Sequence, residues 1–171
     1  MKIEKGTEKR QKNRKCLRNE MKVEFDALSE NEAFARVAVA SFVSPLDPTM
    51  EEISDIKTAV SEAVTNAVIH GYDRGEGEEG CVGENKIYIH CLILNDVLQV
   101  EITDEGKGIE NIEQAMEPLF TTKPDMDRSG MGFAFMEAFM DDLEVISEPG
   151  IGTTVLMSKK LGITPWIDHE E

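Results

Sequence analysis

Residues 102–109 read I-T-D-E-G-K-G-I and residues 128–133 read R-S-G-M-G-F, so two Gly-x-Gly turns flank one long interruption. The first turn follows an apolar strand pattern and an acid, Asp104, and the second directly precedes a run with helix-forming character. Glycine lets a ligand approach the backbone, and amides at a helix N-terminus attract anions. Together these features predict a nucleotide pocket, in which the acid binds the base edge and the glycine-flanked segment closes over the phosphates.

Neither of the standard phosphate-binding signatures accounts for these glycines. The sequence contains no G-x-x-x-x-G-K-[ST], and no strand is followed by a G-x-G-x-x-G that opens a helix. Because glycine turns occur in nearly every domain, a lone Gly-x-Gly is weak evidence. Stronger evidence comes from a helix upstream.

That helix is predicted to begin at Asp47-Pro48, where proline takes the first helical position, and to run to His70 and stop at Gly71. Its expected core face consists of Ile53, Ile56, Val60, Ala63 and Ala67.

Glu62 and Asn66 lie four residues apart on this helix and are therefore neighbours on one face. The Asn66 oxygen can bind Mg²⁺, a hard ion that prefers oxygen ligands and keeps phosphates as its other partners. Glu62 can accept the proton of an attacking hydroxyl or water. The pair indicates metal-assisted phosphoryl transfer.

The remaining periodicity predicts about five strands and three main helices. Residues 21–27 alternate as a strand, and a helix over 30–43 is expected to start with a capping box of Ser29 and Glu32. Its predicted buried face holds Phe34, Val37, Ala38 and Ser41, and further apolar residues around it suggest either a second partner or full burial.

Residues 87–93 and 98–102 alternate on either side of Asn95-Asp96 and predict a hairpin. A helix over 131–140 and strands over 143–147 and 153–157 complete an α/β, or α+β, sandwich with mixed, mostly antiparallel pairing and helices on one face.

Composition predicts one soluble domain. The chain has 171 residues, 40% hydrophobic and 30% charged. No apolar run approaches the roughly 20 residues of a membrane span, and the N-terminus lacks the apolar core of a secretory signal, so we expect a cytoplasmic protein without a membrane partner. The three cysteines lack C-x-x-C spacing and are expected to be free thiols.

The charge is distributed unevenly. Residues 1–16 hold seven Lys or Arg and two Glu, which leaves eleven bases and thirty-two acids, a net charge of -21, over residues 17–171. We expect a disordered basic tail over 1–16, one domain over 17–162 and a C-terminal tail over 163–171. The acidic body disfavours nucleic acid and suits a basic protein partner or a Mg²⁺-neutralised ligand, but charge alone favours a merely solvated acidic surface.

Three motifs resemble the N, G1 and G2 boxes of the GHKL (Bergerat-fold) ATPases: E-A-V-T-N-A-V-I-H-G at 62–71, D-E-G-K-G-I at 104–109 and R-S-G-M-G-F at 128–133. P-G-I-G-T-T at 149–154 matches the last glycine turn of that pattern.

The resemblance is closer to one branch, the sporulation anti-sigma-F factors that are also serine kinases. It is carried by R-N-E-M at 18–21, E-N-E-A-F-A-R-V at 30–37, L-D-P-T-M at 46–50 and P-L-F-T-T-K-P at 118–124.

The resemblance implies a general base at Glu62, a Mg²⁺ ligand at Asn66 and an acceptor for the adenine amino group at Asp104. Gly106 and Gly108 are implied to shape the adenine wall. The other implied binding residues for ATP or ADP are Ile109, Thr121, Thr122, Lys123, Ser129, Gly130, Met131, Gly132, Phe133 and Thr153.

The resemblance also implies a homodimer that holds a sporulation sigma factor inactive and phosphorylates a serine on a small anti-anti-sigma protein. Arg36 is an implied sigma contact, with an ordinary surface arginine as the alternative. Two other functions stay open: a nucleotide-gated binding module with vestigial hydrolysis, and a detached histidine-kinase ATPase domain. His70 is interpreted as a structural helix-end or supporting group, because no second histidine lies on an earlier helix that could accept phosphate.

Overall fold

The computed structural model describes residues 18–72, 85–119 and 130–162. Its five strands form one sheet in the order β1-β2-β3-β5-β4. The strands are β1 (Arg18–Asp26), β2 (Lys86–Leu94), β3 (Val97–Asp104), β4 (Asp142–Glu148) and β5 (Gly152–Lys160). Every neighbouring pair is antiparallel, so the sheet has none of the parallel pairing that a mixed sheet would contain.

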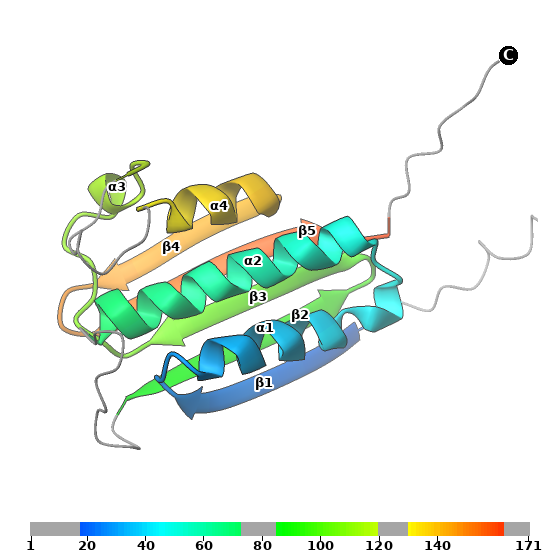
Figure 1. Cartoon of the computed structure of the whole chain (residues 1–171), viewed down its shortest axis with the longest axis horizontal. Helices are drawn as coiled ribbons and strands as arrows, with labels where there is room; N and C mark the ends of the chain where they lie inside the picture. Colours follow the sequence, from blue (N-terminus) through cyan, green and yellow to red (C-terminus); the bar gives the residue numbers. More distant parts are fainter. Residues whose placement is uncertain (1–17, 73–84, 120–129, 163–171) are drawn as a thin grey trace, which may run out of the picture.

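The helices cover one face of this sheet, as the sequence predicts. Figure 1 shows α2 (Met50–Asn66) across the middle, between α1 (Asn31–Phe42) and α4 (Gly132–Phe139). Ala67–Gly71 extend α2 by a wider π-helical turn, which ends at the predicted glycine. A single helical turn that the sequence pattern does not predict, α3 (Ile112–Ala115), follows the β3 end. None of the described helices has the length and apolar character needed to cross a membrane.

The core lies between the helices and the sheet. Alternate residues of the β2–β3 hairpin point into it, because successive side chains of a strand face opposite sides. They are Ile87, Ile89, Cys91, Ile93, Leu98, Val100 and Ile102, all at most 2% exposed. Ile56, Val60, Ala63 and Ala67 meet them from α2, as predicted, whereas Ile53 is only half-buried. Each fully buried aliphatic side chain contributes about 1.5–3 kcal/mol.

The predicted buried face of α1 is wrong. Ala35 and Val39 are fully buried and face the core, whereas Phe34 and Val37 are each 53% exposed. Phe34 only packs edge-on against Phe25 of β1, with ring centroids 6.0 Å apart. Since this helix is apolar on several sides, its pattern cannot single out the side that meets α2. The opposite side remains an apolar surface in this chain.

The predicted starts of α1 and α2 also differ from those in the structure. The residue before α1 is Glu30 and it makes no side-chain cap, so the expected box of Ser29 and Glu32 does not form. Thr49, rather than Asp47, caps α2: its hydroxyl accepts from the Glu52 N–H at 3.1 Å, and the Glu52 carboxylate accepts from the Thr49 N–H at 2.6 Å. This complete capping box outcompetes Asp47, which adopts a left-handed conformation with φ 53°.

Candidate functional site

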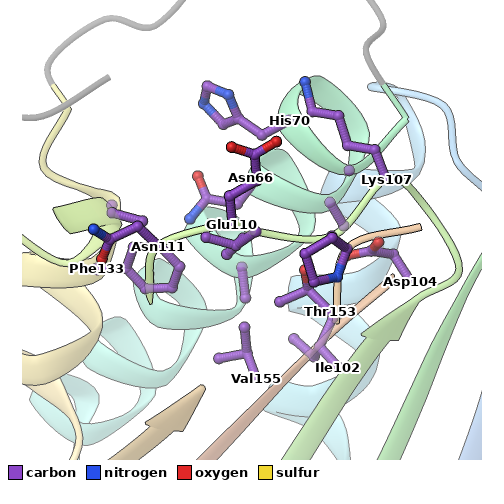
Figure 2. Close-up of a pocket in the computed structure, with 18 of the residues that line it drawn as sticks. Asn66, His70, Ile102, Asp104, Lys107, Glu110, Asn111, Phe133, Thr153 and Val155 are labelled. Carbon is purple, nitrogen blue, oxygen red and sulfur yellow. The ribbon is translucent and has the colours of Figure 1, made fainter. Parts of the chain in front are cut away.

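A pocket of about 440 Å³ opens between the C-terminal half of α2, the end of β3, the start of β5 and the start of α4. Figure 2 shows Ile102 and Val155 at its base, Asp104 and Thr153 on one side, and Phe133 and Asn111 on the other. The sheet therefore supplies an apolar floor and a buried acid, while the helices supply polar groups nearer the mouth. Such a mixture is typical of a small-molecule site.

Asp104 is the last residue of β3 and is only 6% exposed. Its Oδ1 accepts a hydrogen bond from the Gly106 N–H at 2.9 Å, and the backbone of Thr153 donates to the same carboxyl group. Burial raises the pKa of Asp104 above its ordinary value, and the two amides oppose that rise. The carboxylate is thus held by the backbone with its remaining acceptor capacity directed at the pocket.

Glycines around Asp104 allow backbone segments to touch. A Cβ on Gly106 would lie 2.2 Å from the Gly71 carbonyl oxygen, and one on Gly152 would lie 2.0 Å from the backbone carbonyl oxygen of Asp104. Gly108 has φ 70° and would press a Cβ against the Glu148 oxygen at 2.2 Å. These glycines join the α2 end, the turn after β3 and the β4–β5 turn into one rim.

Glu62 and Asn66 meet the first residue of α4. A Cβ on Gly132 would lie 3.1 Å from Glu62 Oε2 and 3.2 Å from Asn66 Oδ1, so the absence of a side chain leaves room beside both groups. An oxygen ligand next to such a space fits Mg²⁺, which takes few protein ligands and completes its shell with phosphate and water. Among the residues that the structure describes, no cluster of three His, Cys, Asp or Glu could hold a metal without such help.

The pocket brings together most of the predicted residues that the structure describes. Its lining includes Asn66, Asp104, Gly108, Ile109, Gly130, Gly132, Phe133 and Thr153. Glu62, Gly106 and Met131 border it rather than line it, and Arg36 lies away from it on α1, 3.2 Å from Glu32. Thr121, Thr122, Lys123 and Ser129 lie outside the described residues. The residues flanking that gap are joined, because the Leu119 N–H donates to the Gly130 carbonyl at 2.9 Å.

Sequence reasoning missed several residues of the lining. Lys107 and His70 reach the mouth of the pocket (Figure 2), and Asn111 lies across from them. His70 is thus a pocket residue as well as a helix-end residue. Ser147, which lies behind the lining, was also missed: its hydroxyl accepts from the Ile109 N–H at 2.8 Å and donates to the Gly152 carbonyl at 2.9 Å. Lys107 stands between the two glycines of the first turn, a place that could have been recognised as facing the ligand.

This geometry, with an acid at a strand end and a Glu/Asn pair facing a glycine-opened helix, defines a histidine kinase-like ATPase domain. Residues 25–159 match the family model of that description. The chain is 56% identical to the anti-sigma F factor of Bacillus subtilis (strain 168) over 145 aligned residues. The alignment covers 85% of this chain and 94% of that protein. The chain is 57% identical over 145 residues to the anti-sigma F factor of Clostridium beijerinckii, with 85% and 96% covered.

A solved structure of the RsbU and RsbW domains of Rv1364c from Mycobacterium tuberculosis aligns with a TM-score of 0.58 at 19% identity. The alignment covers 84% of this chain and 32% of that chain, and it supports the fold alone. The chain belongs to the histidine kinase-like ATPase family and, within it, to the anti-sigma F factors.

Proposed function

We propose that this protein is an ATP-dependent protein serine kinase that binds a sporulation sigma factor and phosphorylates the small anti-anti-sigma protein that opposes it. One observation carries the proposal: Asp104, the Glu62/Asn66 pair and the start of α4 come from distant parts of the chain and surround one pocket. A buried acid can read the exocyclic amine of adenine, and the Glu/Asn pair can serve the phosphate end of the same ligand.

Glu62 is proposed as the general base. It accepts the proton of the substrate serine, whose oxygen then forms a bond to the γ-phosphorus of ATP while the bond to the β-phosphate oxygen breaks and ADP leaves. Asn66 would hold Mg²⁺, which supplies neutralisation of the phosphate charge when it is bound. Lys107 and His70 at the pocket mouth add basic groups near the acidic ligand.

The partner surfaces are proposed on α1. Phe34 and Val37 are each about half exposed on α1. Arg36 is 44% exposed on the same helix, and its guanidinium is paired with Glu32 at 3.2 Å. We propose that the apolar residues meet a second copy and that Arg36 contacts the sigma factor. The name of the relatives, anti-sigma F factor, supports the part of the proposal that concerns a sigma factor, because these relatives are 56% and 57% identical to this chain.

The test of the kinase is phosphate transfer from Mg-ATP to a matching anti-anti-sigma protein. We expect one phosphoserine on each acceptor, and a rate lower by about 10²- to 10⁴-fold in Glu62→Gln. Glu51→Gln, an exposed glutamate at the start of the same helix, is the matched control and should transfer at the wild-type rate.

The result that would overturn the kinase is no transfer to any of several such acceptors by a protein that binds ATP. If ATP still changed which partner co-purifies, the chain would be a nucleotide-gated binding module. Acid-labile phosphohistidine on a partner would instead identify a detached histidine-kinase domain.

A further inference from the structure

Tyr72, which follows the π-helical end of α2, joins three segments of the fold through its hydroxyl group. The hydroxyl lies 2.5 Å from the Lys86 carbonyl oxygen at the start of β2 and 2.8 Å from the Glu105 backbone nitrogen, one residue past β3. Its ring packs against the hydrophobic core. Tyr72 is placed by the wide helical turn before it, in which its own N–H donates to the Ala67 carbonyl at 3.0 Å.

The direction of both bonds follows from their partners. A carbonyl can only accept and an amide N–H can only donate, so the Tyr72 hydroxyl donates to Lys86 and accepts from Glu105. Burial raises the pKa of Tyr72 above its ordinary value, so the hydroxyl keeps the proton that it donates. A phenylalanine in this place would leave both backbone groups without these bonds.

A second bond next to Tyr72 holds the same turn. The Gly71 carbonyl accepts from the Lys107 N–H at 2.9 Å, so adjacent residues of the α2 end bind the backbone at Glu105 and at Lys107. Asp104 directly precedes this stretch, and its Oδ1 would lie 2.8 Å from a Cβ on Gly71. The helix end and the acid therefore have little freedom to move relative to each other.

From these contacts we infer that the Tyr72 hydroxyl is a positioning group that fixes Asp104 and thereby sets the preference of the pocket for adenine over guanine nucleotides. The inference deepens the proposed function and rests on it. Adenine offers an amino group to the carboxylate where guanine offers a carbonyl oxygen, which the carboxylate repels. The carboxylate can attract adenine and repel guanine only if Asp104 is held at a fixed position in the pocket. Loss of the bond between Glu105 and Tyr72 would let the adjacent Asp104 move.

The experiment compares Tyr72→Phe with Tyr88→Phe. Tyr88 is a matched control, because its hydroxyl also contacts Glu105, but at the side-chain Oε2, 3.3 Å away, and not at the backbone. Calorimetry measures ADP and GDP binding with Mg²⁺ to the full chain and to both variants. In Tyr72→Phe we expect ADP to bind about tenfold more weakly than to wild type. The ratio of the affinity for ADP to the affinity for GDP should fall about fivefold or more. Tyr88→Phe should stay within about twofold of wild type for both ligands.

The possible failures are distinguishable. If the wild-type chain binds neither nucleotide, the proposed function fails and the inference fails with it. If the wild type prefers ADP and Tyr72→Phe keeps the same ratio, whether or not both affinities fall together, Tyr72 is merely structural and only the inference is overturned.

A measurement on the wild type covers the case in which Tyr72→Phe does not fold. The Glu105 amide should exchange its hydrogen much more slowly than an amide without a hydrogen-bond acceptor, and ADP should slow the exchange further. Exchange of the Glu105 amide at the unprotected rate would overturn the inference, because the bond from Glu105 to Tyr72 would then be absent in solution.

Discussion

At the scale of single residues, we predict that Asp104 makes nucleotide binding sensitive to pH. Burial raises its pKa, so ionisation disfavours the folded state without ligand: this penalty is present above the raised pKa and is lost as the pH falls through it. A bound adenine amine favours the ionised carboxylate. We therefore predict that ADP affinity decreases as the pH falls from neutral towards the raised pKa of Asp104, measured by calorimetry.

Asp104→Asn is the control for this prediction, because the nucleotide itself also titrates in acid. The variant should bind ADP more weakly at neutral pH and should lose the part of the pH dependence that comes from Asp104. Parallel profiles for wild type and variant would contradict the assignment of the titration to Asp104.

Gly106 shows a second requirement at this scale, the close approach of two backbones. Gly106→Ala would place a Cβ 2.2 Å from the Gly71 carbonyl oxygen, and neither backbone can yield without moving Asp104. We predict a loss of roughly 1–3 kcal/mol in the free energy of unfolding, measured in urea, together with weaker ADP binding. Gly150→Ala is the comparison: it meets no atom within 4 Å, so only its left-handed φ of 81° is strained and ADP binding should be unchanged. Equal ADP affinity in wild type and Gly106→Ala would refute the packing role.

The residues of the pocket were predictable to different degrees. Asn66, Asp104 and Gly132 could be found from sequence because their motifs are local, and because the side chains of Asn66 and Asp104 carry the chemistry. The backbone contacts of Gly106 and Gly152 join positions far apart in sequence, so the sequence alone indicated turns and not a shared rim. Tyr72 gave no signal at all, since a tyrosine after a helix-ending glycine has no chemical pattern of its own.

At the scale of elements, α1 carries the surface that we propose for self-association. Val37 is 53% exposed on the side of the helix away from Ala35 and Val39. Val37→Glu should leave the free energy of unfolding of the monomer within about 0.5 kcal/mol, because it changes a surface position. It should nevertheless shift a dimer to monomer in sedimentation experiments, since a charge would be buried without a partner.

Ile151→Glu provides the control for self-association. Ile151 is 62% exposed in the β4–β5 turn, so the substitution introduces the same charge on an apolar residue of a different element. A dimer that survives Val37→Glu, or one that Ile151→Glu disrupts equally, would move the interface away from α1.

Strands could be predicted from periodicity where one face is more apolar than the other. In the β2–β3 hairpin the buried residues alternate as predicted, although Leu92 and Leu94 are apolar residues of the opposite face. The pattern of α1 failed for the opposite reason: apolar residues surround the helix, and only its packing against α2 decides which of them are buried. The predicted start of α2 was wrong because Asp47 and Thr49 are two candidate cap residues only two positions apart. The reciprocal hydrogen bonds of Thr49 and Glu52 make Thr49 the stronger cap.

At the scale of the whole molecule, net charge opposes the ligand that the pocket suits. Residues 17–171 carry a net charge of -21, so the surrounding potential repels the phosphates of a nucleotide. Lys107 lies at the mouth, but this one positive charge is already included in the net charge and offsets only a small part of the field. A divalent cation shared between Asn66 and the phosphates would neutralise charge where the ligand is held.

Removal of magnesium should therefore weaken ADP binding by about tenfold or more, as measured by calorimetry in EDTA with NaCl added to keep the ionic strength constant. In EDTA, further NaCl should restore part of the affinity, because salt screens the repulsion between the acidic body and the phosphates. Asn66→Ala should bind ADP with nearly the same affinity with and without magnesium, since it lacks the oxygen that we propose as the protein ligand of the ion. Wild-type affinity that is indifferent to EDTA would contradict a shared ion, whereas an Asn66→Ala variant that still loses tenfold would assign the ion to another residue.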